Sequence, residues 1–132
     1  MSVFVDTSAL FAILDADDQN HEQAKQAWVS LITQGTDLVC TSYILVEAFA
    51  LVQRRLGMEA VRVLQEDMAP MLRVEWVDEI THAAGVAVLL TADRRQLSLV
   101  DCVSFNVMRR QSLKLAFTFD GHFAEQGFEQ VP

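Results

Sequence analysis

The sequence is poor in the residues that mark disulfide-rich, disordered and membrane proteins. Its 132 residues include only two cysteines, two prolines and five glycines. The two cysteines form no metal-like pair, so we expect Cys40 and Cys102 to be reduced core thiols of a cytoplasmic protein. The longest run without an acidic or basic residue ends just before Asp93. It is far shorter than the roughly 20 apolar residues that a membrane-spanning helix needs, so we expect no membrane segment.

Basic residues are also scarce. Ten Lys and Arg stand against 18 Asp and Glu, which gives a net charge of −8 and a pI near 4.7. This balance argues against a protein that binds nucleic acid through a general basic surface. It agrees with nucleic-acid binding only if the acids surround a metal ion that inverts the local charge. The positions of the acids therefore decide the interpretation.

Apolar segments alternate between strand-like and helix-like patterns over one predicted domain, residues 1–132. We predict five strands, the third a half-exposed edge strand, and helices between them, with the one at 80–90 mostly buried. The predicted strands are 2–6, 38–40, 73–77, 115–119 and 128–131; the predicted helices are 8–15, 21–33, 43–56, part of 58–71, 80–90 and 98–111. This order predicts an α/β fold with a mostly parallel central sheet flanked by helices. Sites in such folds form beyond the carboxyl ends of the central strands.

Four acids stand in apolar surroundings. Asp6 follows Val-Phe-Val, Glu47 is the only charge in SYILVEAFALVQ, Asp101 lies in LSLVDCVSF, and Asp120 follows LAFTF. A lone ionised carboxylate in an apolar setting costs several kcal/mol unless it is paired or binds a metal. These four residues are therefore the candidates for a functional site.

Each acid also has a structural interpretation. Asp6 could cap a helix, Asp101 completes the capping-box pattern S-x-x-D, and Asp120 begins a D-G turn. Glu47 is the hardest to explain in this way, because it is in the middle of a helix with no Lys or Arg within one turn. Sequence alone leaves these alternatives open.

Four converging carboxylates would repel one another and raise their pKa values, and a divalent cation would relieve that repulsion. Oxygen ligands without a zinc-like His or Cys spacing favour Mg²⁺ or Mn²⁺ over zinc. Such a metal polarises a phosphoryl oxygen and lowers the pKa of a bound water, which suits phosphodiester hydrolysis. Whether one metal or two would bind is left open.

The segments VFVDTSALFAILDADD, TSYILVEAFALV, LSLVDCVSF and FTFDGHF occur in this order over essentially the whole chain. Together they resemble the PIN-domain nucleases, most closely the VapC-type toxin branch. The resemblance implies a small α/β fold with an acidic pocket for Mg²⁺ or Mn²⁺. It also implies single-strand-directed endoribonuclease activity, a homodimer and, in the toxin branch, an antitoxin partner.

The resemblance also implies roles for individual residues. The four family acids, which would be catalytic and metal-binding, correspond in order to Asp6, Glu47, Asp101 and Asp120. Thr7 and Thr118 match the family's hydroxyl positions and would orient carboxylates or waters.

The sequence gives less specific evidence for the roles of residues around the four acids. Arg94 and Arg95 precede the segment that carries Asp101, and we expect them to contact RNA phosphates. Asp93 is a further acid, ranked below the four because its surroundings are polar and a salt-bridged loop explains it. His122 follows Asp120 closely, and we expect it at the surface.

Other functions remain open at this point. The chain could be a housekeeping PIN nuclease for RNA processing without an antitoxin, or a PIN module that binds partners without catalysis. A receiver-like signalling domain is disfavoured, because the first strand supplies one acid and Lys114 precedes its strand. The segments 43–56 and 58–71 are apolar enough to form a dimer or partner surface as well as a core. The sequence does not identify the RNA target.

Overall fold

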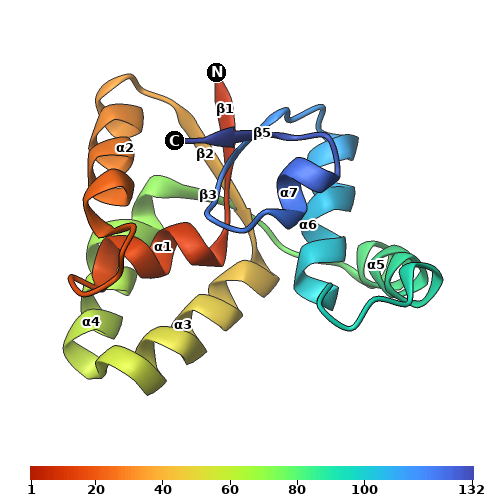
Figure 1. The fold of residues 1–132 in the computed structure, drawn as a ribbon, viewed down its shortest axis with the longest axis horizontal. Coiled ribbons are helices and arrows are strands. Elements are labelled where there is room, and N and C mark those ends of the chain that lie inside the picture. Colours follow the sequence, from red (N-terminus) through yellow and green to blue (C-terminus); the bar gives the residue numbers. More distant parts are fainter.

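A computed structural model describes all 132 residues and contains one five-stranded sheet with the order β3-β2-β1-β4-β5 (Figure 1). Every pairing is parallel, which confirms the predicted α/β class. The predicted edge strand 73–77 is confirmed as β3, at one edge of the sheet. The strands are β1 (Ser2–Val5), β2 (Asp37–Thr41), β3 (Leu72–Glu75), β4 (Leu115–Phe117) and β5 (Glu129–Val131).

Seven α-helices connect the strands. They are α1 (Thr7–Leu14), α2 (His21–Thr33), α3 (Ser42–Leu56), α4 (Met58–Val63), α5 (Glu79–Ala92), α6 (Leu99–Arg110) and α7 (His122–Glu125). Figure 1 shows α1 to α4 on one side of the sheet and α6 and α7 on the other. None of the helices is both long and apolar enough to cross a membrane.

The helix predicted within 58–71 is α4, which covers the first part of that segment. After α4 the chain continues as a π-helix, Leu64–Met68, and a 3₁₀ helix, Ala69–Met71. Pro70 stands at the start of the 3₁₀ helix. Proline has no backbone N–H to donate, so an α-helix could not continue its hydrogen bonding through residue 70.

The core lies against both faces of the central strands. Val3, Phe4 and Val5 of β1 are all completely buried, as expected for a strand covered on both faces. Phe105 of α6 and Phe123 of α7 are also buried and pack edge to face, with ring centroids 5.0 Å apart. This contact fixes the short helix α7 to the core.

Helix α5 lies outside this core, so the prediction that it is mostly buried is wrong. Only Thr81 and Gly85 of α5 are buried, while Ile80 is 79% and Leu90 73% exposed. The helix packs closely on α6: a Cβ added at Gly85 would lie 2.5 Å from Cγ2 of Val103. Its apolar pattern reflects this contact and an exposed apolar surface.

The pairing of β1 with β4 positions the candidate site. In this register Val5 pairs with Phe117, so the next residues, Asp6 and Thr118, leave the sheet side by side. The helices that follow β1 and precede β4 lie on opposite sides of the sheet. The carboxyl ends of β1 and β4 therefore form the switch point at which ligands bind in open α/β sheets.

Candidate metal centre

Asp6 is buried, with 4% of its surface exposed, and its carboxylate is held through one oxygen. Oδ2 accepts hydrogen bonds from the Ser8 hydroxyl (2.7 Å), the Thr118 hydroxyl (2.9 Å) and the Ser8 backbone N–H (3.4 Å). The last of these caps α1, which confirms the capping interpretation. Oδ1 accepts no hydrogen bond from the protein. Asp6 therefore serves the helix with one oxygen and keeps the other available.

The hydroxyl of Thr118 connects two of the acids. It donates to Asp6 Oδ2 and accepts from the backbone N–H of Asp120 at 2.9 Å. Thr118 thus lies where a residue that orients the carboxylates should be. The buried Thr7 hydroxyl makes no hydrogen bond, and its neighbour Ser8 makes the contact with Asp6 instead.

Asp101 caps α6 from inside its first turn. Its backbone N–H donates to the Ser98 hydroxyl at 3.0 Å, and its Oδ2 accepts from the Ser98 backbone N–H at 3.3 Å. The capping box expected from the sequence is confirmed. As in Asp6, one carboxylate oxygen is used and Oδ1 accepts no hydrogen bond.

Asp120 repeats this arrangement after β4. Its Oδ1 accepts from the backbone N–H of His122 at 2.9 Å, and its Oδ2 accepts no hydrogen bond. We call Asp6, Asp101 and Asp120 the acidic site. None of their three unused oxygens is among the fully enclosed, unpaired side-chain atoms of the molecule. Each of these oxygens therefore keeps some exposed surface.

His122 belongs to this site, so the prediction that it is a surface residue is wrong. Its side chain is only 19% exposed, and its Nδ1 lies 3.1 Å from Asp120 Oδ1 and 3.7 Å from Asp101 Oδ2. Nδ1 is enclosed and makes no well-aligned hydrogen bond despite these short distances. Donor atoms of Asp101, Asp120 and His122 lie within 4.8 Å of one another. The sequence signal that could have identified His122 was its D-x-H spacing from Asp120, followed by Phe123, an aromatic residue that is buried.

Burial raises the pKa of Asp6, and hydrogen bonds from Ser8 and Thr118 partly offset this rise. The negative charges of Asp101 and Asp120 raise it further. The pKa of Asp101 is also raised, first by burial and then by the Asp120 charge, against hydrogen bonds from Ser98. No Lys or Arg forms an ion pair with any of the three acids. The acidic site thus concentrates negative charge without an arginine or lysine to balance it.

Glu47 differs from the other three predicted acids. It is exposed on α3, makes no hydrogen bond or ion pair, and is not among the charges that raise the pKa values of Asp6 and Asp101. The desolvation argument for Glu47 was therefore wrong. Its apolar neighbours in the sequence pack elsewhere, because Ile44 and Ala48 occupy the buried face of the same helix.

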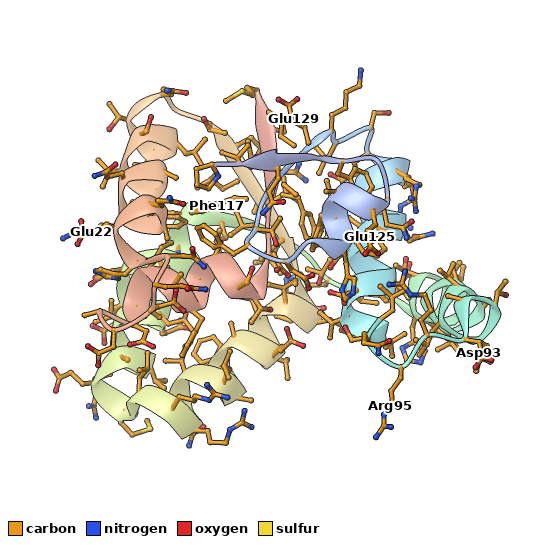
Figure 2. The ribbon with its side chains drawn as sticks, in the orientation of Figure 1. Glu22, Asp93, Arg95, Phe117, Glu125 and Glu129 are labelled. Carbon is orange, nitrogen blue, oxygen red and sulfur yellow. The ribbon has the colours of Figure 1, made fainter.

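The loop before α6 carries the two predicted RNA contacts. Arg94 Nη1 forms an exposed ion pair with Glu125 Oε2 at 3.1 Å, and Arg95 is exposed without an ion pair. Asp93 is exposed and ends α5 in the left-handed conformation, with φ of 50°. Figure 2 shows Asp93 and Arg95 pointing away from the body of the molecule. Asp93 does not join the acidic site. The ion pair that Arg94 forms is with Glu125, not with Asp93.

The residues present fit a divalent cation. Three carboxylates keep one oxygen each without a hydrogen bond, and burial together with mutual repulsion makes their ionised forms costly. A cation bound among them would supply the missing positive charge. Carboxylates suit Mg²⁺ and Mn²⁺, and the imidazole of His122 adds a ligand type that transition metals accept.

Comparisons with known proteins agree with this geometry. Residues 3–129 match the PIN domain. The 23S rRNA-specific endonuclease VapC20 of Mycobacterium tuberculosis, from strains CDC 1551 / Oshkosh and H37Rv, is 34% identical over 130 residues. These residues cover 98% of this chain and 97% of the relative.

Solved structures show the same likeness. The crystal structure of M. tuberculosis VapC20, a sarcin-ricin loop cleaving toxin, matches with a TM-score of 0.87 and 33% identity, covering 98% of this chain and 99% of that one. FitAcB from Neisseria gonorrhoeae matches with a TM-score of 0.70 and 18% identity over 100% and 97% of the two chains, which supports the fold alone. The chain therefore belongs to the PIN-domain nucleases, in their VapC-type toxin branch.

Proposed function

We propose that this protein is a metal-dependent endoribonuclease that hydrolyses phosphodiester bonds of RNA, and that it is the toxin of a toxin–antitoxin pair. The observation that carries the proposal is the acidic site, where three acids each keep one oxygen unused and no Lys or Arg balances them. The similarity to a 23S rRNA-specific endonuclease makes that rRNA the first substrate to test. An enzyme that acts on ribosomal RNA would work in the cytoplasm.

In this proposal Asp6, Asp101 and Asp120 hold Mg²⁺ or Mn²⁺. The bound metal would polarise the phosphoryl oxygen and activate water for hydrolysis. Ser8 and Thr118 fix the Asp6 carboxylate, so its free oxygen needs little rearrangement to bind a cation. Glu47 remains in the proposal as the fourth acid, because an exposed glutamate can change rotamer quickly. The unpaired Thr7 hydroxyl is proposed to orient a water.

Arg94 and Arg95 are proposed to contact RNA phosphates. They precede α6, whose first turn carries Asp101, so the loop lies near the acidic site along the chain. The ion pair of Arg94 with Glu125 is exposed and therefore weak enough to exchange for a phosphate. Replacing Arg95 with Gln should weaken RNA binding and reduce the slope of log affinity against log salt concentration by about one.

We also propose that the protein forms a homodimer through exposed apolar residues that follow β3 and lie on α3. Trp76 is 75% exposed and lines, with Val46, a cavity of ≈ 520 Å³ beside α3. Ile80, four residues after Trp76, continues the apolar surface onto α5. Trp76→Glu should convert the dimer to a monomer in light scattering without loss of folding, because Trp76 contributes little to the core. A wild-type protein that is already monomeric would exclude this arrangement.

The direct test of activity uses purified protein, 23S rRNA and an unstructured RNA. We expect cleavage with Mn²⁺ or Mg²⁺ and none with chelator. Asp101→Asn should abolish cleavage while keeping the capping box, because the amide oxygen of asparagine can still accept the hydrogen bond from the Ser98 backbone N–H. Cleavage that is indifferent to metal, or that persists in Asp101→Asn, would contradict the proposal.

A second test separates a toxin from a housekeeping nuclease. Expression of a toxin alone should arrest growth. Co-expression with the product of a small adjacent reading frame, with a DNA-binding N-terminus and a disordered tail, should relieve that arrest. Normal growth with full RNA-cleaving activity would favour the housekeeping alternative.

A further inference from the structure

His122 places a nitrogen atom directly among the acids. Two carboxylate oxygens from different elements, Asp101 Oδ2 of α6 and Asp120 Oδ1 after β4, lie 3.7 and 3.1 Å from its Nδ1. We infer that Nδ1 of His122 is a nitrogen ligand of the metal held by Asp101 and Asp120. The inference rests on the proposed metal-dependent function and specifies the centre as a mixed carboxylate–imidazole site that favours Mn²⁺ over Mg²⁺.

The shorter distance, 3.1 Å between His122 Nδ1 and Asp120 Oδ1, is that expected of neighbouring ligands of a single ion. Octahedral ions of this size bind ligands at about 2.0–2.1 Å, which separates adjacent ligand atoms by roughly 3 Å. The two carboxylate oxygens next to Nδ1 each accept one backbone hydrogen bond, from Ser98 and His122 respectively. They are thus the hydrogen-bonded oxygens of the two carboxylates, and the unused oxygens, Asp101 Oδ1 and Asp120 Oδ2, lie on the same groups. A carboxylate oxygen has a second acceptor direction, so neither bond prevents it from binding a cation.

The fold holds this imidazole rigidly. The backbone N–H of His122 is tied to Asp120, and the next residue, Phe123, is completely buried. The Phe123 ring packs on Phe105 of α6 at 5.0 Å and on Phe4 of β1 at 6.1 Å between centroids. The helix that bears Asp101 and the strand that precedes Asp6 therefore both fix the position of His122. Such preorganisation is expected of a metal ligand.

The other two histidines show what an ordinary structural histidine looks like in this protein. His21 Nδ1 donates to the backbone carbonyl of Ala12 at 2.8 Å, and His82 Nδ1 hydrogen-bonds the hydroxyl of Tyr43. Only the Nδ1 of His122 is enclosed without a hydrogen bond. A metal-binding imidazole uses one ring nitrogen as the ligand, and Nδ1 is the nitrogen of His122 that faces the two acids.

This ligand would affect which metal is bound. Mg²⁺ prefers oxygen ligands, whereas imidazole binds transition metals more readily, in line with the general order of divalent affinities. We therefore expect His122→Gln to weaken Mn²⁺ binding roughly 10- to 100-fold, the size of loss seen when supporting groups of metal sites are removed. Mg²⁺ binding should change less, so the ratio of the two affinities should fall.

The decisive experiment is pulsed electron paramagnetic resonance of Mn²⁺ bound to the full chain without RNA. We expect ¹⁴N modulation from one imidazole in the wild type. The modulation should disappear in His122→Gln and persist in the matched controls His21→Gln and His82→Gln. Protein labelled with ¹⁵N-histidine should show the same coupling at the ¹⁵N frequency, which tests ligation without any mutation.

The result separates the inference from the proposed function. Bound Mn²⁺ without nitrogen coupling in the wild type, or coupling that survives in His122→Gln, would overturn the inference and identify His122 as a counter-charge for the acids. Metal-dependent RNA cleavage would still support the nuclease in that case. Conversely, nitrogen coupling without RNA cleavage would support the ligand and refute the ribonuclease.

Discussion

The chain gathers acids in two places and balances their charge in opposite ways. Near the edge of the sheet, Asp37 and Glu75 share the guanidinium of Arg73, with N–O distances of 2.9 and 3.1 Å. Gln111 also donates to Glu75, at 2.6 Å. We call these four residues the Arg73 network. At the carboxyl ends of β1 and β4, the acidic site has no Lys or Arg partner.

The pKa values of the acids shift in opposite directions in the two places. Hydrogen bonds from Arg73 hold the pKa of Asp37 below its usual value. Burial raises the pKa values of Asp6 and Asp101. The guanidinium of Arg73 balances its acids within the folded chain, whereas the acidic site has only the imidazole of His122 beside it. A count of carboxylates would treat the two groups as equal, and only the position of the arginine distinguishes them.

The largest effect should come from removing one acid of each group. Asp6→Asn should lower RNA cleavage at least about 10²-fold, since loss of metal catalysis costs several kcal/mol at 1.36 kcal/mol per tenfold. Asp37→Asn should leave the rate unchanged. Single-turnover cleavage of RNA with Mn²⁺ measures both variants. Equal losses in the two variants would erase the functional distinction between the groups.

Metal binding should stabilise the folded protein through the acidic site and not through the Arg73 network. At a Mn²⁺ concentration of 100 times its Kd, the free energy of unfolding should rise by about 2.7 kcal/mol. Asp101→Asn should lose this gain, and Arg73→Gln should keep it in full. Urea denaturation with and without Mn²⁺ provides the measurement. A gain that survives in Asp101→Asn would place the bound ion elsewhere.

Breaking the Arg73 network should have a smaller effect. The side chains of Arg73 and Asp37 are 46% and 41% exposed, and exposed ion pairs contribute about 0–1 kcal/mol. Arg73→Gln should therefore lower the free energy of unfolding by no more than about 1 kcal/mol. The loss should shrink at high salt, which screens exposed charges. A salt-independent loss would indicate that packing, not charge, holds this network.

The smallest effect should be a pH dependence of the same network. Because the pKa of Asp37 is lowered in the folded protein, its stabilisation is present above the unfolded-state pKa and is lost as pH falls through the folded-state pKa. The difference in unfolding free energy between wild type and Asp37→Asn should therefore shrink on acidification from neutral pH. A difference that stays constant would show that Asp37 does not stabilise through its charge.

Much of this architecture could be predicted from the sequence, because local signals were strong. The helix His21–Thr33 has the predicted bounds, and α3 differs by one residue at its start, where Thr41 caps it. Three acids of the site were found because two follow buried strands and one sits in a capping box. The strand order required knowledge of pairings between residues far apart in the chain, which no local pattern supplies.

Two expectations about burial at the site, a buried Glu47 and an exposed His122, were wrong for physical reasons. Helix α3 is apolar on most of its surface, so the sequence could not show which face packs inward and that Glu47 points outward. His122 begins a helix of only four residues, too short for any periodic signal. Its burial depends on Phe123, which fills a space between α6 and β1 that exists only in the folded protein.

The place of β4 has a consequence for the timing of synthesis. This strand lies between β1 and β5, yet it follows six of the seven helices in the chain. A growing chain therefore carries Asp6 long before it gains Asp101 and then Thr118, Asp120 and His122. Until β4 is made and inserted beside β1, the newly made protein cannot complete the acidic site. A nuclease built in this way would thus stay inactive until its last strands have been made.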